Sequence, residues 1–159
     1  MLTGDWKAVE ALIKVLKNEA EIASNQALAQ AGLKAEAIAK THISKQDLNW
    51  TPLKASTVAA KVKKGQSENI LVATSTYFQS ITSWHTKGKA YVGIKKQVVE
   101  EDGSLVADIA RTLEYGSVTR NIPERPLWQP TMAEVIKWMK EGKNKPSSIL
   151  LERLNKYKR

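Results

Sequence analysis

One long apolar seam in the first 44 residues constrains the fold of this chain more than any other feature. Its members recur at alternating steps of three and four: Trp6, Val9, Ile13, Leu16, Ala20, Ala23 and Ala27. This spacing predicts an amphipathic helix from Met1 to about Ser44. The second half of the seam is almost all alanine, which allows a close neighbour. We expect the seam to pack on the protein's own sheet; the alternative is an intersubunit helix contact.

Gly32 is the weak point of this predicted helix. A glycine inside a helix costs about 1 kcal/mol relative to alanine, because its backbone loses more freedom on folding. We therefore expect a bend or a break at Gly32, after which the helix resumes with "LKAEAIAKTHI".

Shorter elements follow the long helix. Ser56 or Thr57 can cap a short helix that ends at Gly65. Alternating segments on either side of "KGK" predict a β-hairpin between about Ser80 and Lys96, with Gly88 in its turn. A second pairing across Asp102 and Gly103 would extend that hairpin.

Three further helices are expected in the rest of the chain. "LVADIARTLEYG" predicts a short amphipathic helix that Gly116 stops. A helix after Pro130 has a capping-box pattern at Thr131 and Glu134, and its apolar stripe consists of Val135, Trp138 and Met139. Pro146 suits the first turn of a last helix or tail.

The order of these elements predicts the α+β class. We expect a long N-terminal helix and shorter helices packed on a small antiparallel β-sheet with a β-hairpin. The length of 159 residues favours one domain. We therefore expect residues 1–142 to form a single α+β domain, with residues 143–159 as a basic C-terminal helix or tail.

Composition narrows the possible partners. The net charge of +9 comes from 25 basic and 16 acidic residues, with much of the excess in "KVKKG" and in residues 143–159. This charge fits acidic partners, and a basic nucleic-acid-binding module is one hypothesis. Solvated helix ends and a basic tail explain it more simply. There is no cysteine, and no stretch has the features of a targeting segment or a membrane span.

Motifs for catalysis are missing from the sequence. It contains no nucleophile elbow, Gly-rich phosphate loop or HExxH pattern. We expect His42 and His85 to occupy ordinary surface positions rather than a metal site, and the acidic tip from Glu100 to Asp102 to be a solvated turn. Glu114 and Glu124 could form a carboxylate pair across a loop. We expect no enzymatic activity, no cofactor and no metal; a small hydrolase remains a minor alternative.

Three blocks in the middle of the chain carry a resemblance to a known family. "WTPLKASTVAAK" begins at Trp50, "ILVATSTYFQSI" begins at Ile70, and "ADIARTLEYGSVTRNIPERPLWQP" ends at Pro130. In this order they resemble segments of tailed-phage virion-morphogenesis and tail-completion proteins. The second block departs from the family pattern, since Ser75 and Thr76 flank the place of its usual glycine.

The resemblance implies a structural protein of the phage neck or tail completion. Such proteins form a ring, commonly a hexamer, at the head-proximal end of the tail and join it to the head-tail connector or stopper. The expected partners are copies of the chain itself, the connector, and tail terminator or tail tube proteins. DNA would pass the lumen without specific binding, and no membrane is involved. The location would be the virion, after assembly in the host cytoplasm. A tail terminator or another minor tail protein is the nearest alternative.

The proline-rich segment from Leu113 to Pro130 and the hairpin are the expected contact surfaces. Interfaces favour Trp, Tyr and Arg anchors, and prolines reduce the entropy lost when a loop is ordered. The candidate interface residues are Tyr115, Arg120, Arg125, Leu127 and Trp128 in the loop, with Trp84 and Tyr91 in the hairpin. The expected structural residues are Trp50, Pro52, Leu53, Glu114, Gly116, Pro123 and Pro126. We expect carboxylates such as Glu114 or Glu124 to hold Arg125; alternatively, Leu127 and Trp128 simply plug the edge of the core.

Overall fold

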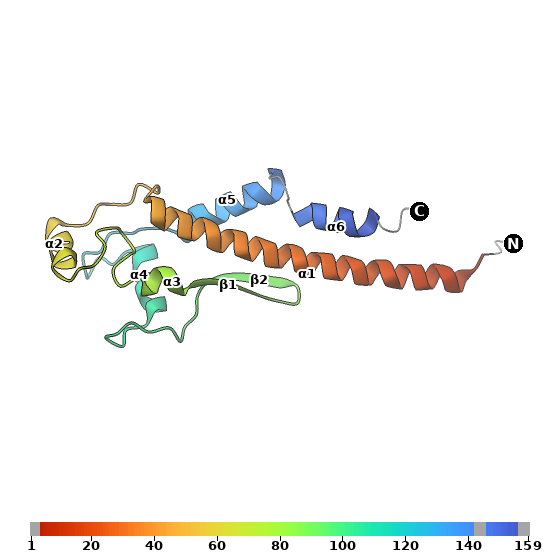
Figure 1. The fold of residues 1–159 in the computed structure, drawn as a ribbon, viewed down its shortest axis with the longest axis horizontal. Helices are drawn as coiled ribbons and strands as arrows, with labels where there is room; N and C mark the ends of the chain where they lie inside the picture. Colours follow the sequence, from red (N-terminus) through yellow and green to blue (C-terminus); the bar gives the residue numbers. More distant parts are fainter. Residues whose placement is uncertain (1–3, 142–145, 156–159) are drawn as a thin grey trace.

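The computed structural model describes residues 4–141 and 146–155, and its fold is α+β, which confirms the expected class. The elements in chain order are α1 (Trp6–Lys45), α2 (Ala55–Lys63), α3 (Thr76–Ser80), β1 (Ile81–Thr86), β2 (Lys89–Ile94), α4 (Val106–Tyr115), α5 (Trp128–Glu141) and α6 (Pro146–Asn155). The long α1 forms the axis of the molecule. The hairpin lies along one side of it, and α5 and α6 lie along another (Figure 1).

The long helix α1 is continuous through Gly32, so the expected break there is wrong. The backbone N–H of Gln46 closes the last turn on the His42 carbonyl at 2.8 Å, and the Asp5 carboxylate caps the first turn by accepting from Ala8 N–H at 3.1 Å. A Cβ at Gly32 would lie only 3.3 Å from the Cβ of Ser83. Gly32 therefore permits the close approach of the hairpin, and the packing of the hairpin on the helix offsets its poor helix propensity.

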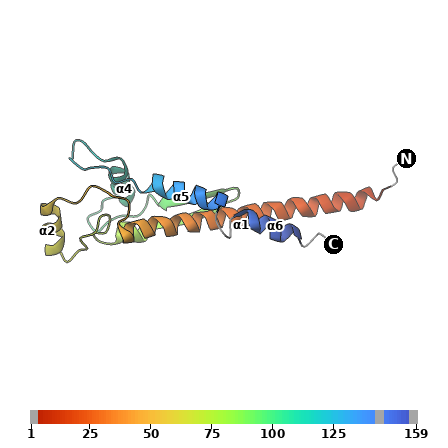
Figure 2. The same cartoon turned by 90° about the horizontal axis from the view of Figure 1, so that it is seen from above.

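The apolar seam of α1 packs within the chain mainly beyond Ile13, since Trp6, Val9 and Ile13 are exposed whereas Leu16 is half-buried. Ala23 is buried and Ala27 is half-buried, and the buried face continues through Ala35 and Ala39. Trp6 is 66% exposed, and the N-terminal part of α1 extends past the hairpin and α6 (Figures 1 and 2). The seam thus divides into a packed part and a protruding part, and no residue within the described chain covers Trp6.

The predicted hairpin is confirmed. β1 and β2 pair antiparallel around the turn at Lys87 and Gly88, and Gly88 has a φ of +76°. Trp84 lies opposite Tyr91, and their rings stack with centroids 5.6 Å apart. The pairing across Asp102 and Gly103 forms one isolated bridge, Val99 with Leu105, so it does not extend the two-stranded sheet.

The core gathers at the C-terminal end of α1. Ile43, Ile81, Val106 and Leu127 are fully buried there and come from four different segments. Figure 2 shows α2, α4 and the intervening loops collected at this end of the long axis. The packing of these segments fixes the loop between α4 and α5.

Two predicted helix starts are wrong. α5 begins at Trp128, so Thr131 lies inside its first turn, where its hydroxyl donates to the Leu127 carbonyl at 2.7 Å. α2 begins at Ala55, after Lys54, and no side chain caps it; Ser56 and Thr57 are therefore helical residues rather than caps.

The C-terminal segment forms a helix that starts at Pro146, as its sequence predicts. α6 lies against α1, and Arg153 Nε donates to the Glu19 carboxylate at 2.6 Å. The boundary expected between residues 142 and 143 falls outside the described residues, as does the end of the tail. In the described parts of the chain, no helix combines the length and the hydropathy that a membrane crossing requires.

Candidate assembly surface

The loop from Gly116 to Leu127, which joins α4 to α5, is held by Glu114 at the end of α4. One oxygen of the Glu114 carboxylate accepts from Leu127 N–H at 2.8 Å, and the other accepts from Trp128 N–H at 3.2 Å. These two amides belong to the start of α5, where backbone donors have no partner inside the helix. Glu114 therefore caps α5 from across the loop, and a carboxylate also suits the positive end of the helix dipole.

Gly116 sets the direction of the loop where α4 ends. Its φ is +69°, and a Cβ there would lie 2.9 Å from both Ile122 O and Glu124 N. Only glycine fits this combination of conformation and close backbone approach. Beyond it, the backbones of Ser117 and Ile122 exchange two hydrogen bonds of 2.8 and 2.9 Å, which fold the tip of the loop back on itself.

The Trp50 segment supports the other side of the loop. The indole Nε1 of Trp50 donates to the Pro126 carbonyl at 2.9 Å, and Arg125 Nη2 donates to the Thr51 carbonyl at 3.3 Å. Arg125 N–H also donates to the Leu113 carbonyl at 2.7 Å. The first and third of the sequence blocks therefore meet in space and brace one another.

The expected interface residues of the loop divide into buried and exposed groups. Leu127 is fully buried in the core, and Arg125 is 6% exposed. Trp128 is half-buried, whereas Tyr115 is 76% exposed and Arg120 is also exposed. The alternative of a core plug therefore describes Leu127, and Arg125 also faces inward. Tyr115 and Arg120 remain accessible to a partner.

The ionic support expected for Arg125 is wrong. Within the described residues, no ion pair joins its guanidinium to Glu114 or Glu124, and its Nε is buried without a hydrogen-bond partner. Burial lowers the pKa of Arg125. The two carboxylate oxygens of Glu114 instead accept hydrogen bonds from backbone amides, and Glu124 is exposed. Glu114 and Glu124 therefore do not act as a carboxylate pair.

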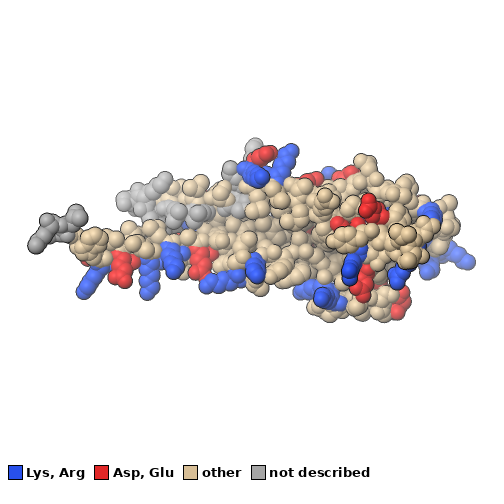
Figure 3. All heavy atoms as spheres, turned by 180° about the vertical axis from the view of Figure 1, so that it is seen from behind, with Lys and Arg blue, Asp and Glu red and all other residues tan. Residues whose placement is uncertain are grey.

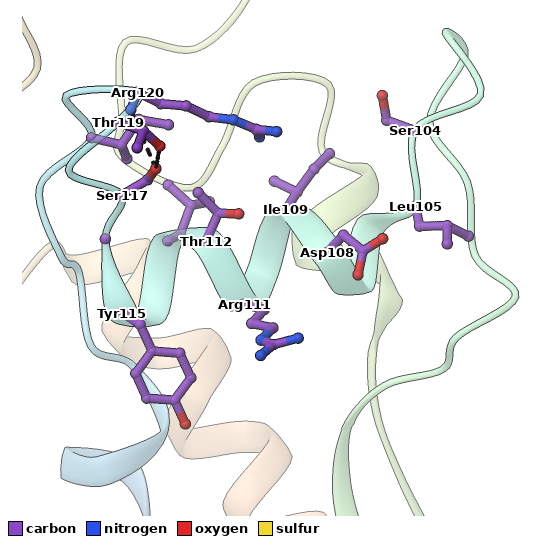
Figure 4. A pocket seen from close by; sticks show the side chains of 13 residues that line it. Ser104, Leu105, Asp108, Ile109, Arg111, Thr112, Tyr115, Ser117, Thr119 and Arg120 are labelled. Carbon is purple, nitrogen blue, oxygen red and sulfur yellow. Dashed lines mark hydrogen bonds between the residues drawn. The ribbon is translucent and has the colours of Figure 1, made fainter.

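A groove runs beside the loop along α4. It has a volume of about 1110 Å³ and is lined by α4, by the Ser104 and Leu105 backbone segment and by the loop tip. Figure 4 shows Arg120 extending from the loop on one side of α4, while Arg111 and Tyr115 point from the other side of the helix. The exposed residues of the loop therefore border a concave surface rather than a flat one.

Val118 at the loop tip is a surface residue that the sequence did not single out. Its side chain is 99% exposed, between the paired residues Ser117 and Ile122. The only sequence signal is a lone β-branched apolar residue inside the polar stretch "GSVTR". In the hairpin, Tyr91 is exposed and Trp84 is half-buried beside it.

His42 is not at an ordinary surface position, which corrects that expectation. It is 5% exposed; its Nδ1 lies 2.7 Å from the Asp47 carboxylate, and its Nε2 lies 3.4 Å from Glu134. The hydrogen bond with His42 lowers the pKa of Asp47. His85 is exposed on β1, as expected. In residues 4–141 and 146–155, no group of His, Asp or Glu side chains could hold a metal ion.

On the face shown in Figure 3, aspartate and glutamate side chains are interspersed among the more numerous lysine and arginine side chains. Lys87 and Glu21 form an ion pair.

Comparison with known protein families, with curated proteins and with solved structures finds no match for this chain.

Proposed function

We propose that this protein is a structural component of the neck or tail-completion region of a tailed phage. It would form a ring, with six copies as the expected size, at the head-proximal end of the tail. The observation that carries the proposal is the braced loop from Gly116 to Leu127. Its inner residues anchor it to the core, its outer residues Val118 and Arg120 lie exposed, and Tyr115 at the end of α4 is exposed beside them.

This arrangement suits a protein that assembles with copies of itself. A ring needs two different patches on each subunit, because each copy meets its neighbour through a heterologous contact. Exposed apolar side chains lie at several separate places on the described part of the chain, among them Trp6 and Ile13 at the protruding start of α1 and Val118 at the tip of the α4–α5 loop. Rigid loops also lose little entropy on binding.

The three sequence blocks that begin at Trp50, begin at Ile70 and end at Pro130 support the more specific proposal of a tail-completion protein. Their order resembles that in tail-completion proteins, and the first and third blocks support one another through Trp50 and Pro126. We infer that the further partners are the connector or stopper on one side and the tail terminator or tail tube on the other. We infer that DNA passes through the lumen of the ring without specific binding, and that the ring is part of the virion. A tail terminator or another minor tail protein is the nearest variant of this proposal.

The first test is the oligomeric state of the purified full-length chain, measured by light scattering and by electron microscopy. We expect closed rings. Val118→Asp should abolish them, because it places a charge where the loop tip would meet a neighbour. Val62→Asp is the matched control, since Val62 is also exposed but lies on α2.

Each outcome of this test has a clear meaning. Rings that survive in Val62→Asp and disappear in Val118→Asp support the loop as an assembly surface. A strictly monomeric wild-type chain that also fails to bind tail tubes or filled heads would count against the proposed function.

A further inference from the structure

A second concave site lies beside α2 and α4, and Arg125 of the α4–α5 loop forms part of its wall. This cavity has a volume of about 490 Å³ and lies between α2, the segment that follows it, the turn at Glu100 to Asp102, and α4. Its walls include apolar side chains such as Leu53, Ile70 and Val72, together with two nearly buried cations, Lys61 and Arg125.

Lys61 is buried to an unusual degree for a lysine. It is only 9% exposed near the end of α2, and its Nζ donates to the Asn69 carbonyl at 2.6 Å. Burial lowers its pKa, and the nearby charge of Glu68 opposes this shift only in part. A carbonyl oxygen is a neutral partner, so the ammonium charge has no counter-charge in contact with it.

Arg125 adds a second uncompensated cation to the same cavity. Its guanidinium reaches the Thr51 carbonyl, but its Nε is buried without a partner. Buried charges are costly unless they are both paired and hydrogen-bonded. Arg125 therefore has one buried N–H donor that is unsatisfied, and its side chain forms part of the cavity wall.

Two of the three acidic residues in the cavity wall, Glu100 and Asp102, accept hydrogen bonds from other side chains or the backbone. Both oxygens of the Glu100 carboxylate accept from the Thr74 hydroxyl, at 3.1 and 2.9 Å, and Asp102 accepts from Ser104 N–H at 2.9 Å. Glu101 is exposed. In the part of the chain that the structure describes, no carboxylate forms an ion pair with Lys61 or Arg125.

We propose that this cavity binds a carboxylate carried on an apolar body. The carboxylate would accept from Lys61 Nζ and from Arg125 Nε, and the apolar body would lie against Leu53, Ile70 and Val72. A carboxylate has two acceptor oxygens, one for each of the two donors, and charge-assisted hydrogen bonds of this kind are roughly twice as strong as neutral ones.

Two sources can supply this group: a small organic acid, or an aspartate or glutamate side chain from a second copy of the chain. The second source rests on the proposed ring, whereas the first is independent of it. Titration of the full-length protein with hexanoate tests the first source, and sedimentation of the protein alone tests the second.

The variants are Lys61→Met, which keeps the length of the side chain and removes its charge, and Lys63→Met, a control at an exposed position of the same helix. By calorimetry at constant ionic strength, we expect saturable binding of one hexanoate per chain. Lys61→Met should weaken it by about tenfold, the effect of losing one charged hydrogen bond. Lys63→Met should leave it unchanged, and circular dichroism would check that both variants fold.

If hexanoate does not bind but Lys61→Met alone weakens self-association by about tenfold, the carboxylate comes from a second copy. Tighter binding of inorganic phosphate than of hexanoate would overturn the assignment, because phosphate has no apolar body. Equal effects of Lys61→Met and Lys63→Met would also overturn the assignment. So would the absence of any effect of Lys61→Met on both hexanoate binding and self-association. A wild-type chain that stays monomeric yet binds hexanoate would contradict the proposed ring assembly, but it would still support the proposed carboxylate site.

Discussion

The sequence predicted that Glu114 is a structural residue, but it did not predict that Glu114 caps α5. The sequence pattern of Thr131 and Glu134 predicts a capping box, yet α5 starts three residues before Thr131. The cap comes instead from Glu114, fourteen residues before Trp128 in the chain. Local patterns describe caps made by neighbouring residues, and they carry no information about a carboxylate that reaches a helix start from across a loop.

Replacement of Glu114 tests this cap. Glu114→Ala leaves the amides of Leu127 and Trp128 without their acceptor, and we expect a loss of about 1 to 3 kcal/mol in the free energy of unfolding. Glu114→Gln, which keeps one acceptor oxygen, should lose less. Urea denaturation measures both, with Glu124→Ala as the exposed control in the same loop. Equal stability of Glu114→Ala and the wild type would show that the cap is dispensable.

Gly116 offers a second test at the same scale. Gly116→Ala combines a left-handed backbone with a Cβ 2.9 Å from two backbone atoms, so we expect it to destabilise the chain by more than about 1 kcal/mol. Gly65→Ala is a matched control, because Gly65 has a similar φ of +66° but no atom within 4 Å of the added Cβ. The difference between the two variants in thermal or urea unfolding isolates the steric contact. Identical losses would mean that the contact relaxes without cost.

At the scale of the elements, α1 organises the molecule through its contact with the hairpin. The carboxylate of Glu36 accepts from both the backbone N–H and the hydroxyl of Ser83, at 2.8 and 2.9 Å, and from Lys40 Nζ at 2.7 Å. Together with the close approach at Gly32, these bonds fix the position of β1 along the helix. The hairpin itself was predictable from its turn and alternation, but this docking was not, because it depends on residues far apart in the sequence.

The pH dependence of stability tests the Glu36 contact. Burial alone would raise the pKa of the Glu36 carboxyl, but the hydrogen bonds from Lys40 and Ser83 outweigh it, so its pKa lies below 4.5. The stabilisation is therefore fully present above about pH 4.5 and is lost as the pH falls through the lowered pKa. At pH 7 we expect Glu36→Gln to be less stable than the wild type by about 1 to 2 kcal/mol.

That difference should shrink on acidification to pH 3, measured as free energy of unfolding in urea. Glu10→Gln, at an exposed position of α1, is the control and should change little over the same range. A difference between Glu36→Gln and the wild type that stays constant from pH 7 to pH 3 would rule out the charged carboxylate as its cause.

The spacing of apolar residues in the α1 seam predicts a helix, but it does not predict how much of that helix the rest of the chain covers. At 1.5 Å per residue, a helix of 40 residues is about 60 Å long. The seam predicts that the helix has one apolar face along its first 27 residues, but it does not say how much partner surface the rest of the chain can provide. The hairpin and α6 stop short of Trp6 (Figure 1), and the seam residues Trp6, Val9 and Ile13 are left exposed.

At the scale of the whole molecule, the sequence predicted the class and the position of the braced loop. It could not separate the inward residues of that loop from the outward ones. Arg125 and Trp128 both suit an interface by composition, yet Arg125 is buried because the Trp50 segment covers it. The cavity at Lys61 was also beyond prediction, since its walls come from four separate segments.

Electron microscopy of phage particles assembled without this protein tests the proposed head-tail joining most directly. We expect separate DNA-filled heads and separate tails, and joining should return when the wild-type chain is supplied and fail when Val118→Asp is supplied. Intact virions in the absence of the protein would show that it does not join heads to tails.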